Sequence, residues 1–268
     1  MSGGGTYSVR VSRKCRQMER VITFLVCAVG LLGSIPSQAE DVEPRWLVEA
    51  PTAGVLPTKQ VAVDIRFSVG NGLLADVEIG LWQRALIGIS FGGQDLLGSQ
   101  SADWNPDPGV SARIRILNET ESRPALAMGF RSQGSGPYDA VLKRYQSKSL
   151  GVYGVISRNY RNPTGQGGVH FGLNRSLETD DGDESLTGFV GGDLEVAGRI
   201  AAIAEYHFGF NDDDGLALGK GRGNLNLGIR WLVTSRVSLE FDLKDVLENS
   251  ERIQRPDREV RVVFLRGK

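Results

Sequence analysis

The chain has few of the residues that most often act in catalysis and metal binding. It has two cysteines, Cys15 and Cys27, and two histidines, His170 and His207, in 268 residues. Both cysteines lie in the first 39 residues, so a mature chain that loses this segment has no disulfide, no cysteine nucleophile and no cysteine-based metal site. The glycine-rich stretches also lack the spacing of a phosphate-binding loop. The sequence therefore predicts no metal and no cofactor.

The chain also lacks a strong charge imbalance and, after its first 39 residues, a long apolar run. Its formal net charge is -1, which gives no electrostatic footprint for a phosphate backbone, so nucleic acid is not an expected partner. No later stretch reaches 18 apolar residues, which excludes a spanning helix there. Residence in a membrane would have to come from strands.

The first 39 residues have the layout of a secretory signal peptide. Basic residues precede an apolar run at 21–35, and Ser37-Gln38-Ala39 supplies the small residues that favour cleavage after Ala39. A transmembrane anchor is the alternative, although the run is shorter than the roughly 20 residues that span a bilayer. Met18 opens a more conventional signal, which makes residues 1–17 a candidate start-site artefact.

About twelve short segments of alternating apolar and polar residues follow the signal. In 61–69, apolar side chains take every odd position while Asp64 and Arg66 point the other way. Further segments begin near residues 77, 86, 110, 125, 150, 169, 186, 200, 225, 237 and 259. This alternation predicts an all-β fold, a single antiparallel transmembrane β-barrel of about twelve strands over residues 60–268.

The connections between these segments alternate in length. The short ones are 82–84, 195–197 and 234–236, and the long ones are 94–109, 132–147, 178–184, 211–222 and 245–256. Short periplasmic turns and longer outside loops are the outer-membrane arrangement, with both termini periplasmic. Residues 40–59 are then a periplasmic lead-in to the barrel, and the sequence leaves open whether this segment hangs in the periplasm or folds back into the lumen. A soluble periplasmic binding barrel is an alternative, and it would place inside the residues Val61, Val63, Ile65 and Phe67.

The turns also predict which charges face each other in the lumen. With 70–72 and 234–236 as turns, the facing pairs are Arg66 with Asp76, Asp64 with Glu78, and Arg230 with Glu240. A ladder of this kind predicts a narrow, partly filled interior, since twelve strands lie between filled eight-stranded and open sixteen-stranded barrels. The luminal charges expected to set selectivity or to plug the pore are Asp64, Arg66, Asp76, Glu78, Arg113, Arg115, Arg131, Arg230, Glu240, Asp242 and Lys244.

The loops contain weaker candidates for ion-binding and sugar-binding sites. The acidic stretches 180–184 and 211–215 look like calcium loops, but neither fits the EF-hand spacing. They are interpreted as solvated loop tips, with weak divalent-ion sites as the alternative. Trp104 and Tyr138 lie in predicted loops, where an aromatic ring can stack on a sugar ring.

The two histidines leave an enzymatic alternative open. His170 and His207 lie on polar strand faces, with Ser157 and Glu205 as conceivable partners. An outer-membrane lipid or glycan hydrolase would need one of these histidines at the rim beside a serine or an acid. Neither histidine lies in a hydrolase motif, so the sequence predicts a non-enzymatic protein.

Several short stretches of the sequence, which follow one another in the same order, resemble YjbH-type barrel domains. They are the stretch 48–53 with Leu56-Pro57, Asp103-Trp104-Asn105-Pro106 with 108–110, Lys143-Arg144-Tyr145-Gln146, and 239–249. The resemblance spans residues from about 46 to the end and implies an outer-membrane β-barrel associated, in part of the family, with exopolysaccharide production or export. It brings no active-site residues. Family members are often larger, and the C-terminal aromatic of this chain, Phe264, lies four residues before the end.

These observations together predict a non-enzymatic protein of the outer membrane of a Gram-negative bacterium. Its function is expected to be that of a narrow pore or of an envelope component of polysaccharide secretion. The expected partners are outer-membrane lipid, lipopolysaccharide and the barrel-assembly machinery, together with polysaccharide or other secretion components.

Overall fold

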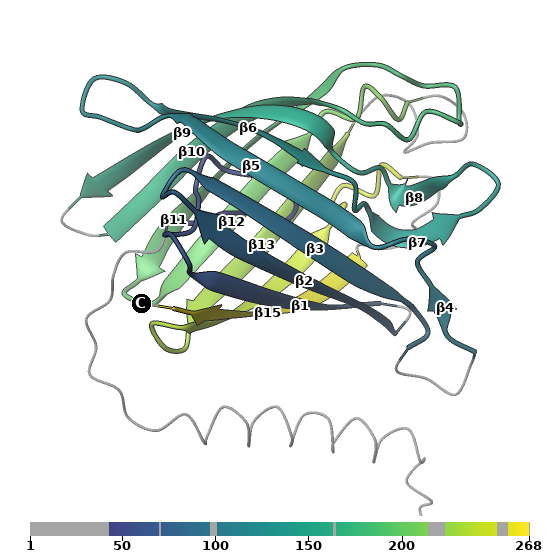
Figure 1. Ribbon diagram of the computed structural model, residues 1–268, viewed down its shortest axis with the longest axis horizontal. Helices are drawn as coiled ribbons and strands as arrows, with labels where there is room; N and C mark the ends of the chain where they lie inside the picture. Colours follow the sequence, from purple (N-terminus) through teal and green to yellow (C-terminus); the bar gives the residue numbers. More distant parts are fainter. Residues whose placement is uncertain are drawn as a thin grey trace, which may run out of the picture. The chain divides into compact units, whose positions relative to one another are not determined.

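Twelve antiparallel strands close into a β-barrel (Figure 1). The computed structural model describes residues 43–69, 71–96, 101–162, 165–213, 223–250 and 257–267, so the predicted signal peptide and its cleavage site lie outside the described residues. The barrel strands are β1 (Val61–Ser68), β2 (Gly72–Leu81), β3 (Ala85–Gln94), β5 (Gly109–Leu117), β6 (Ala125–Arg131), β9 (Gly151–Asn162), β10 (Gly165–Arg175), β11 (Thr187–Ala197), β12 (Ile200–His207), β13 (Asn224–Leu232), β14 (Val237–Lys244) and β15 (Asp257–Arg266). The predicted fold class and strand count are confirmed.

The ring closes because β1 pairs with β2 on one side and with β15 on the other. Two small additions lie at the end with the long loops. The two-residue strand β4 (Asp103–Trp104) pairs with the end of β3, and β7 (Ser135–Asp139) pairs with β8 (Arg144–Ser147) as a separate hairpin. Among the described residues, no helix is long and apolar enough to cross a membrane.

The strands turn their polar residues inward and their apolar residues outward. In β1, Asp64 and Arg66 are buried while Val63 and Ile65 are partly exposed. The same holds around the ring, where exposed apolar residues include Ile89, Ile114, Val169, Phe171, Ile229 and Phe241. This orientation contradicts the soluble barrel, which required the valines, Ile65 and Phe67 of β1 to face inside.

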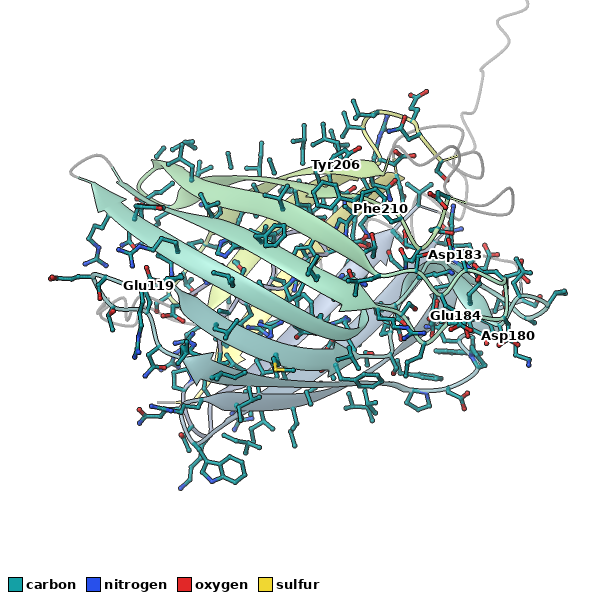
Figure 2. The ribbon with its side chains drawn as sticks, turned by 90° about the horizontal axis from the view of Figure 1, so that it is seen from above. Glu119, Asp180, Asp183, Glu184, Tyr206 and Phe210 are labelled. Carbon is teal, nitrogen blue, oxygen red and sulfur yellow. The ribbon has the colours of Figure 1, made fainter. Side chains whose placement is uncertain are left out.

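The two ends of the barrel differ in their connections. Figure 2 shows Glu119, on the turn between β5 and β6, at one end, and Asp180, Asp183 and Glu184, on the loop between β10 and β11, at the other. The turn predicted at 195–197 lies later, since β11 continues to Ala197 and Gly198 takes the left-handed conformation with a φ of 50°. A glycine adopts that conformation without steric cost.

The register of the first hairpin differs from the prediction by two residues. Asp64 faces Asp76, and Glu78 faces Ala62, so neither predicted charge pair of this hairpin forms. The later prediction is confirmed, because Arg230 of β13 faces Glu240 of β14 and donates to it with an Nε to Oε1 distance of 2.8 Å.

The turn itself explains the shift in the first hairpin. Ser68 pairs with Gly72, so Gly72 belongs to β2 and the connection is 69–71, of which Gly70 lies outside the described residues. Asn71 has a φ of 57°, a conformation that asparagine tolerates better than most residues. The turn therefore ends on Asn71 and does not need Gly72.

Residues 43–57, called the plug below, lie inside the barrel. Its buried apolar residues are Trp46, Leu47, Val48, Ala50, Ala53, Val55 and Leu56, each with at most 8 % of its surface exposed. It contacts β2, β5, β9, β12, β13 and β15, which lie all around the ring. The described part of the predicted periplasmic lead-in is therefore largely luminal (Figure 1, purple), because the charged lumen supplies partners for its backbone.

Candidate functional site

The plug is a compact turn that fits among the luminal side chains. Leu47 N–H donates to the Ala50 carbonyl over 2.9 Å, and Thr52 N–H donates to the Arg45 carbonyl over 3.1 Å. Gly54 is needed because a Cβ there would lie 2.3 Å from the Pro44 carbonyl oxygen. The plug connects to β1 at the end of the short turns, where Lys59 N–H donates to the Gly80 carbonyl over 2.9 Å.

One buried carboxylate holds the tip of this turn. Glu205 of β12 accepts hydrogen bonds from three successive backbone N–H groups, those of Val48, Glu49 and Ala50, at 2.9–3.1 Å. Asn226 Nδ2 also donates to Glu205, over 2.8 Å. Successive N–H groups form an anion-binding concavity. Sequence reasoning found Glu205 only as a partner for a histidine, because a side-chain contact to irregular backbone leaves no periodic signal.

Arginines of the lumen hold the carbonyl groups of the plug. Each donates to a backbone oxygen that has left water and would otherwise be unpaired, a situation that costs about 1–3 kcal/mol per group. The contacts are Arg113 Nη1 to the carbonyls of Arg45 (2.8 Å) and Gly54 (2.7 Å), Arg115 Nε to Ala53 (2.8 Å), and Arg230 Nη2 to Trp46 (2.7 Å).

Two guanidinium groups of the barrel wall contact the rings of Trp46. The central carbons of Arg113 and Arg131 are each 4.5 Å from the centre of its rings. Trp46 Nε1 donates to Glu78 Oε1 over 3.3 Å. Cation–π contacts of desolvated arginines are worth about 2 kcal/mol, so Trp46 anchors the plug together with Arg45, which pairs with Asp64 and Glu78.

The predicted luminal charges divide into two groups. Seven contact the plug: Asp64 and Glu78 through Arg45, Arg113, Arg115 and Arg230 through carbonyls, Arg131 through Trp46, and Lys244 through Glu49. The other four, Arg66, Asp76, Glu240 and Asp242, contact the barrel's own charges or, for Asp242, have no hydrogen-bond partner among the described residues. Sequence reasoning missed Arg45 and Arg261, which both pair with Asp64.

His170 is part of a hydrogen-bonded trio under the plug. Its Nδ1 lies 2.8 Å from Ser157 Oγ and its Nε2 lies 3.1 Å from Asp193 Oδ1. Ser157 Oγ also accepts the N–H of Ala53 of the plug over 2.8 Å. Ser157 and His170 are 2 % and 1 % exposed, so the trio lies within the lumen and not at a rim. His207 contacts Glu205, with Nε2 and Oε1 3.2 Å apart.

The long loops are tied together by Arg144 of β8. Its guanidinium meets both carboxylate oxygens of Asp212, at 2.5 and 2.8 Å, and one of Asp181, at 2.6 Å. Lys148 adds a second cation to Asp181, at 2.7 Å. The prediction of solvated loop tips is wrong for these two aspartates, and the described residues contain no cluster of acids or histidines that could hold a metal ion. Residues 214–215 of the second acidic stretch lie outside the described part.

Burial and charge act on the titratable groups of this outer cap. Burial lowers the pKa of the Arg144 guanidinium, but hydrogen bonds and the charge of Asp212 outweigh it and hold that pKa above its usual range. Burial raises the pKa of Glu178, against opposing hydrogen bonds from Ser149 and from the Tyr145 N–H. Arg144 is therefore a permanent cation that holds two loops together.

Arg144→Lys is expected to loosen the outer cap. Lysine keeps the charge but cannot make the forked contact to Asp212, and a charged hydrogen bond of this kind is worth about 1.5–3 kcal/mol. Limited proteolysis of the folded protein should therefore cut the long loops at least about tenfold faster. Lys143→Ala, at an exposed neighbour paired with Asp180, is the control. Equal cleavage of all three proteins would contradict the role of Arg144.

Aromatic side chains gather near both ends of the outer surface. At the end of the long loops, Trp104 stacks on Phe91 with ring centres 5.4 Å apart, and Phe208 stacks on Phe210 at 5.6 Å (Figure 2 labels Tyr206 and Phe210). Exposed aromatics towards the other end are Trp82, Tyr160 and Trp231. Trp104 therefore lies on the outer wall beside β3, whereas Tyr138 packs edge-on against Tyr145 in the cap.

Comparison with known proteins gives similarities to solved outer-membrane barrels. No protein-family model matches the chain, and no curated protein matches it. A KdgM porin is 7 % identical and covers 76 % of this chain and 98 % of its own, with a TM-score of 0.45. Omp33 of Acinetobacter baumannii is 10 % identical and covers 76 % and 96 %, with a TM-score of 0.44. The COG4313 channel of Pseudomonas putida F1 is 10 % identical and covers 86 % and 100 %, with a TM-score of 0.41.

Proposed function

We propose that this chain is an outer-membrane β-barrel that acts as a narrow channel gated by its plug. The exposed aliphatic band between two groups of aromatic residues fits a hydrocarbon layer with an interface on each side. The short turns then lie in the periplasm and the long loops outside. With this orientation the plug enters the lumen from the periplasmic end.

The proposal of a gate rests on the contacts that hold the plug in the lumen. Its backbone is bound by charged side chains of the barrel wall, Glu205 and three arginines. Hydrogen bonds to charged groups are worth about 1.5–3 kcal/mol each, and water can take the place of the plug in them. The plug also packs apolar residues against the wall, and exposing these to water adds to the cost of its release. The eleven charged side chains of the lumen remain compatible with water after the plug leaves, which suits a channel, although the wall also presents apolar residues such as Phe189 and Ile203 to the plug.

A link to exopolysaccharide production or export is a further part of this proposal. It is supported by the resemblance of the stretches around Trp104, Tyr145 and Phe241 to YjbH-type barrel domains. Deletion of the gene is expected to lower the secreted polysaccharide of the host, and the intact gene is expected to restore it. Unchanged polysaccharide in the deletion strain would contradict the link and leave the channel itself untouched.

Single-channel recording tests the gate. In Glu205→Ala the turn of the plug loses the acceptor of three N–H groups, so the open time in a planar bilayer is expected to rise at least about tenfold, the equivalent of 1.4 kcal/mol. Glu121→Ala, at an exposed residue of a short turn, is the control. Equal open times in the wild type and Glu205→Ala, with both proteins folded, would contradict gating by the plug.

Hydrolysis is the second candidate function, favoured by the trio of Ser157, His170 and Asp193. The serine is within hydrogen-bond reach of the histidine, and the histidine is within reach of the acid, the order of contacts in a nucleophile–base–acid constellation. The plug covers it, so activity would require the plug to leave. A fluorophosphonate probe should then label a plug-free barrel at Ser157 and leave Ser157→Ala unlabelled. Absence of labelling would leave the trio as an anchor for Ala53.

A further inference from the structure

A polar cavity of about 80 Å³, called the outer vestibule below, lies between the plug and the outer cap. Glu49 of the plug and Lys148 of the cap are among the residues that line it, and the barrel wall contributes Arg66, Arg131, Asn174 and Asn224. A smaller cavity of about 30 Å³ shares Arg66 and residues 133–135 with it. The two spaces therefore meet on the same arginine.

The wall of the outer vestibule holds polar atoms that the protein does not satisfy. Glu49 Oε1, Arg66 Nε, Arg131 Nη1, Asn174 Oδ1 and Asn224 Oδ1 have no hydrogen-bond partner among the described residues. The two arginines and the two asparagines are only 4–7 % exposed. Buried polar groups in native proteins are nearly always paired with protein groups or with water, so these atoms around one cavity are open to water or to a ligand that offers the matching donors and acceptors.

Arg66 has the weakest ion pair at this cavity. Among the described residues one acid lies within 4 Å of its guanidinium, Glu259 at 3.9 Å, which is too far for a hydrogen bond. The other charges at the cavity are engaged. The pairs are Arg131 with Asp76 at 2.7 Å, Lys148 with Asp181 at 2.7 Å, Glu49 with Lys244 at 2.9 Å, and Asp212 with Arg144 at 2.5 Å. The cation that is left to bind a ligand is therefore Arg66, with one free N–H of Arg131 beside it.

The donors and acceptors define the chemistry of the ligand. Guanidinium N–H groups favour a carboxylate or a similar oxyanion, and two amide oxygens require donors, which hydroxyl groups provide. A cavity of about 80 Å³ holds roughly six waters, at about one probe sphere for each water. Six waters take up about as much space as one sugar ring. A carboxylated monosaccharide unit satisfies all three conditions.

We propose that the outer vestibule binds one unit of an acidic saccharide, with its carboxylate on Arg66 and Arg131 and its hydroxyls on Asn174 and Asn224. This inference rests on the proposed function only for the route by which the sugar arrives from outside. A ligand in the outer vestibule would also act on the plug, because Arg131 contacts Trp46 of the plug as well as the cavity.

Calorimetry on the folded full-length protein in detergent micelles tests the site, with glucuronate as the probe. Glucuronate is expected to bind, whereas glucose, which lacks the carboxylate, and acetate, which lacks the hydroxyls, should each bind at least about tenfold more weakly. Arg66→Gln should weaken glucuronate binding by about tenfold to a hundredfold, the range for a lost charged hydrogen bond. Arg236→Gln, at an exposed arginine of a short turn, should bind like the wild type.

A second variant covers the case in which Arg66→Gln does not fold. Asn224→Asp keeps the acceptor and the shape but adds a negative charge, so it should weaken glucuronate binding and leave glucose binding unchanged. No binding of glucuronate to the folded wild type, or acetate binding as tightly as glucuronate, would overturn the proposal. Because calorimetry in micelles needs no conductance, a protein that binds glucuronate but never conducts would refute the channel and keep the site, and the reverse result would refute the site alone.

Discussion

Replacing residues 43–57 by a flexible glycine–serine linker of equal length is expected to turn a mostly closed barrel into an open channel. If the plug is held by only about 3 kcal/mol, the open state of the wild type is populated below about 1 %, so the open time should rise about a hundredfold. The seven charges that contact the plug would then face water and set the ion selectivity. Single-channel recording in a planar bilayer measures both properties.

A disulfide that holds the plug in the lumen is expected to have the opposite effect, a closed channel. The Ala53 nitrogen lies 2.8 Å from Ser157 Oγ, so a disulfide between Ala53→Cys and Ser157→Cys would link the plug to β9 at an existing contact. No other cysteine remains after cleavage of the predicted signal. The oxidised double variant should be silent, and reduction should restore the openings of the wild type. A linker variant that folds, as judged by heat-modifiable gel mobility, and still shows no conductance would contradict the channel.

The twelve strands could be predicted because a membrane barrel imposes a two-residue period on every strand. The apolar face must meet lipid and the polar face must meet the lumen, and segments such as 61–69 and 237–243 follow this rule closely. The pairing of Arg230 with Glu240 followed from the turn at 234–236 by the same rule. The predicted register of the first hairpin was wrong because two adjacent residues, Asn71 and Gly72, can both adopt a positive φ. A turn that moves by one residue shifts the pairing of the strands by two residues.

The plug could not be predicted from its own residues. Its backbone bonds run to side chains that lie far along the chain, such as Glu205, 155 residues beyond Ala50, and no spacing rule links them. A signal was nevertheless present on the lumen side, where eleven predicted charges crowd a narrow barrel. Such charges need partners or water, and a short segment next to β1 with exposed carbonyl and N–H groups is a suitable partner. The charges were predicted to control or plug the pore, but in the structure most of them hold a plug.

Leu227→Arg is expected to destabilise the folded protein in lipid by about 2–4 kcal/mol, the cost of an arginine on the lipid face near mid-bilayer. Leu227 lies near the middle of β13, is 37 % exposed and pairs with Ala204 and Leu243 on the neighbouring strands, so its side chain faces outward. In a bilayer the guanidinium must either leave water or deform the lipid to keep it. Urea titration of the protein folded in lipid vesicles measures the loss of unfolding free energy.

Leu247→Arg is the matched control, since Leu247 is 53 % exposed but lies in the loop after β14. Beyond the interface the same substitution should cost no more than about 1 kcal/mol. If the apolar band of the barrel faced water, both variants would behave as surface substitutions and change the stability by about 0.5 kcal/mol at most. The difference between the two variants therefore measures whether lipid covers β13, and equal costs would refute the membrane placement on which the channel depends.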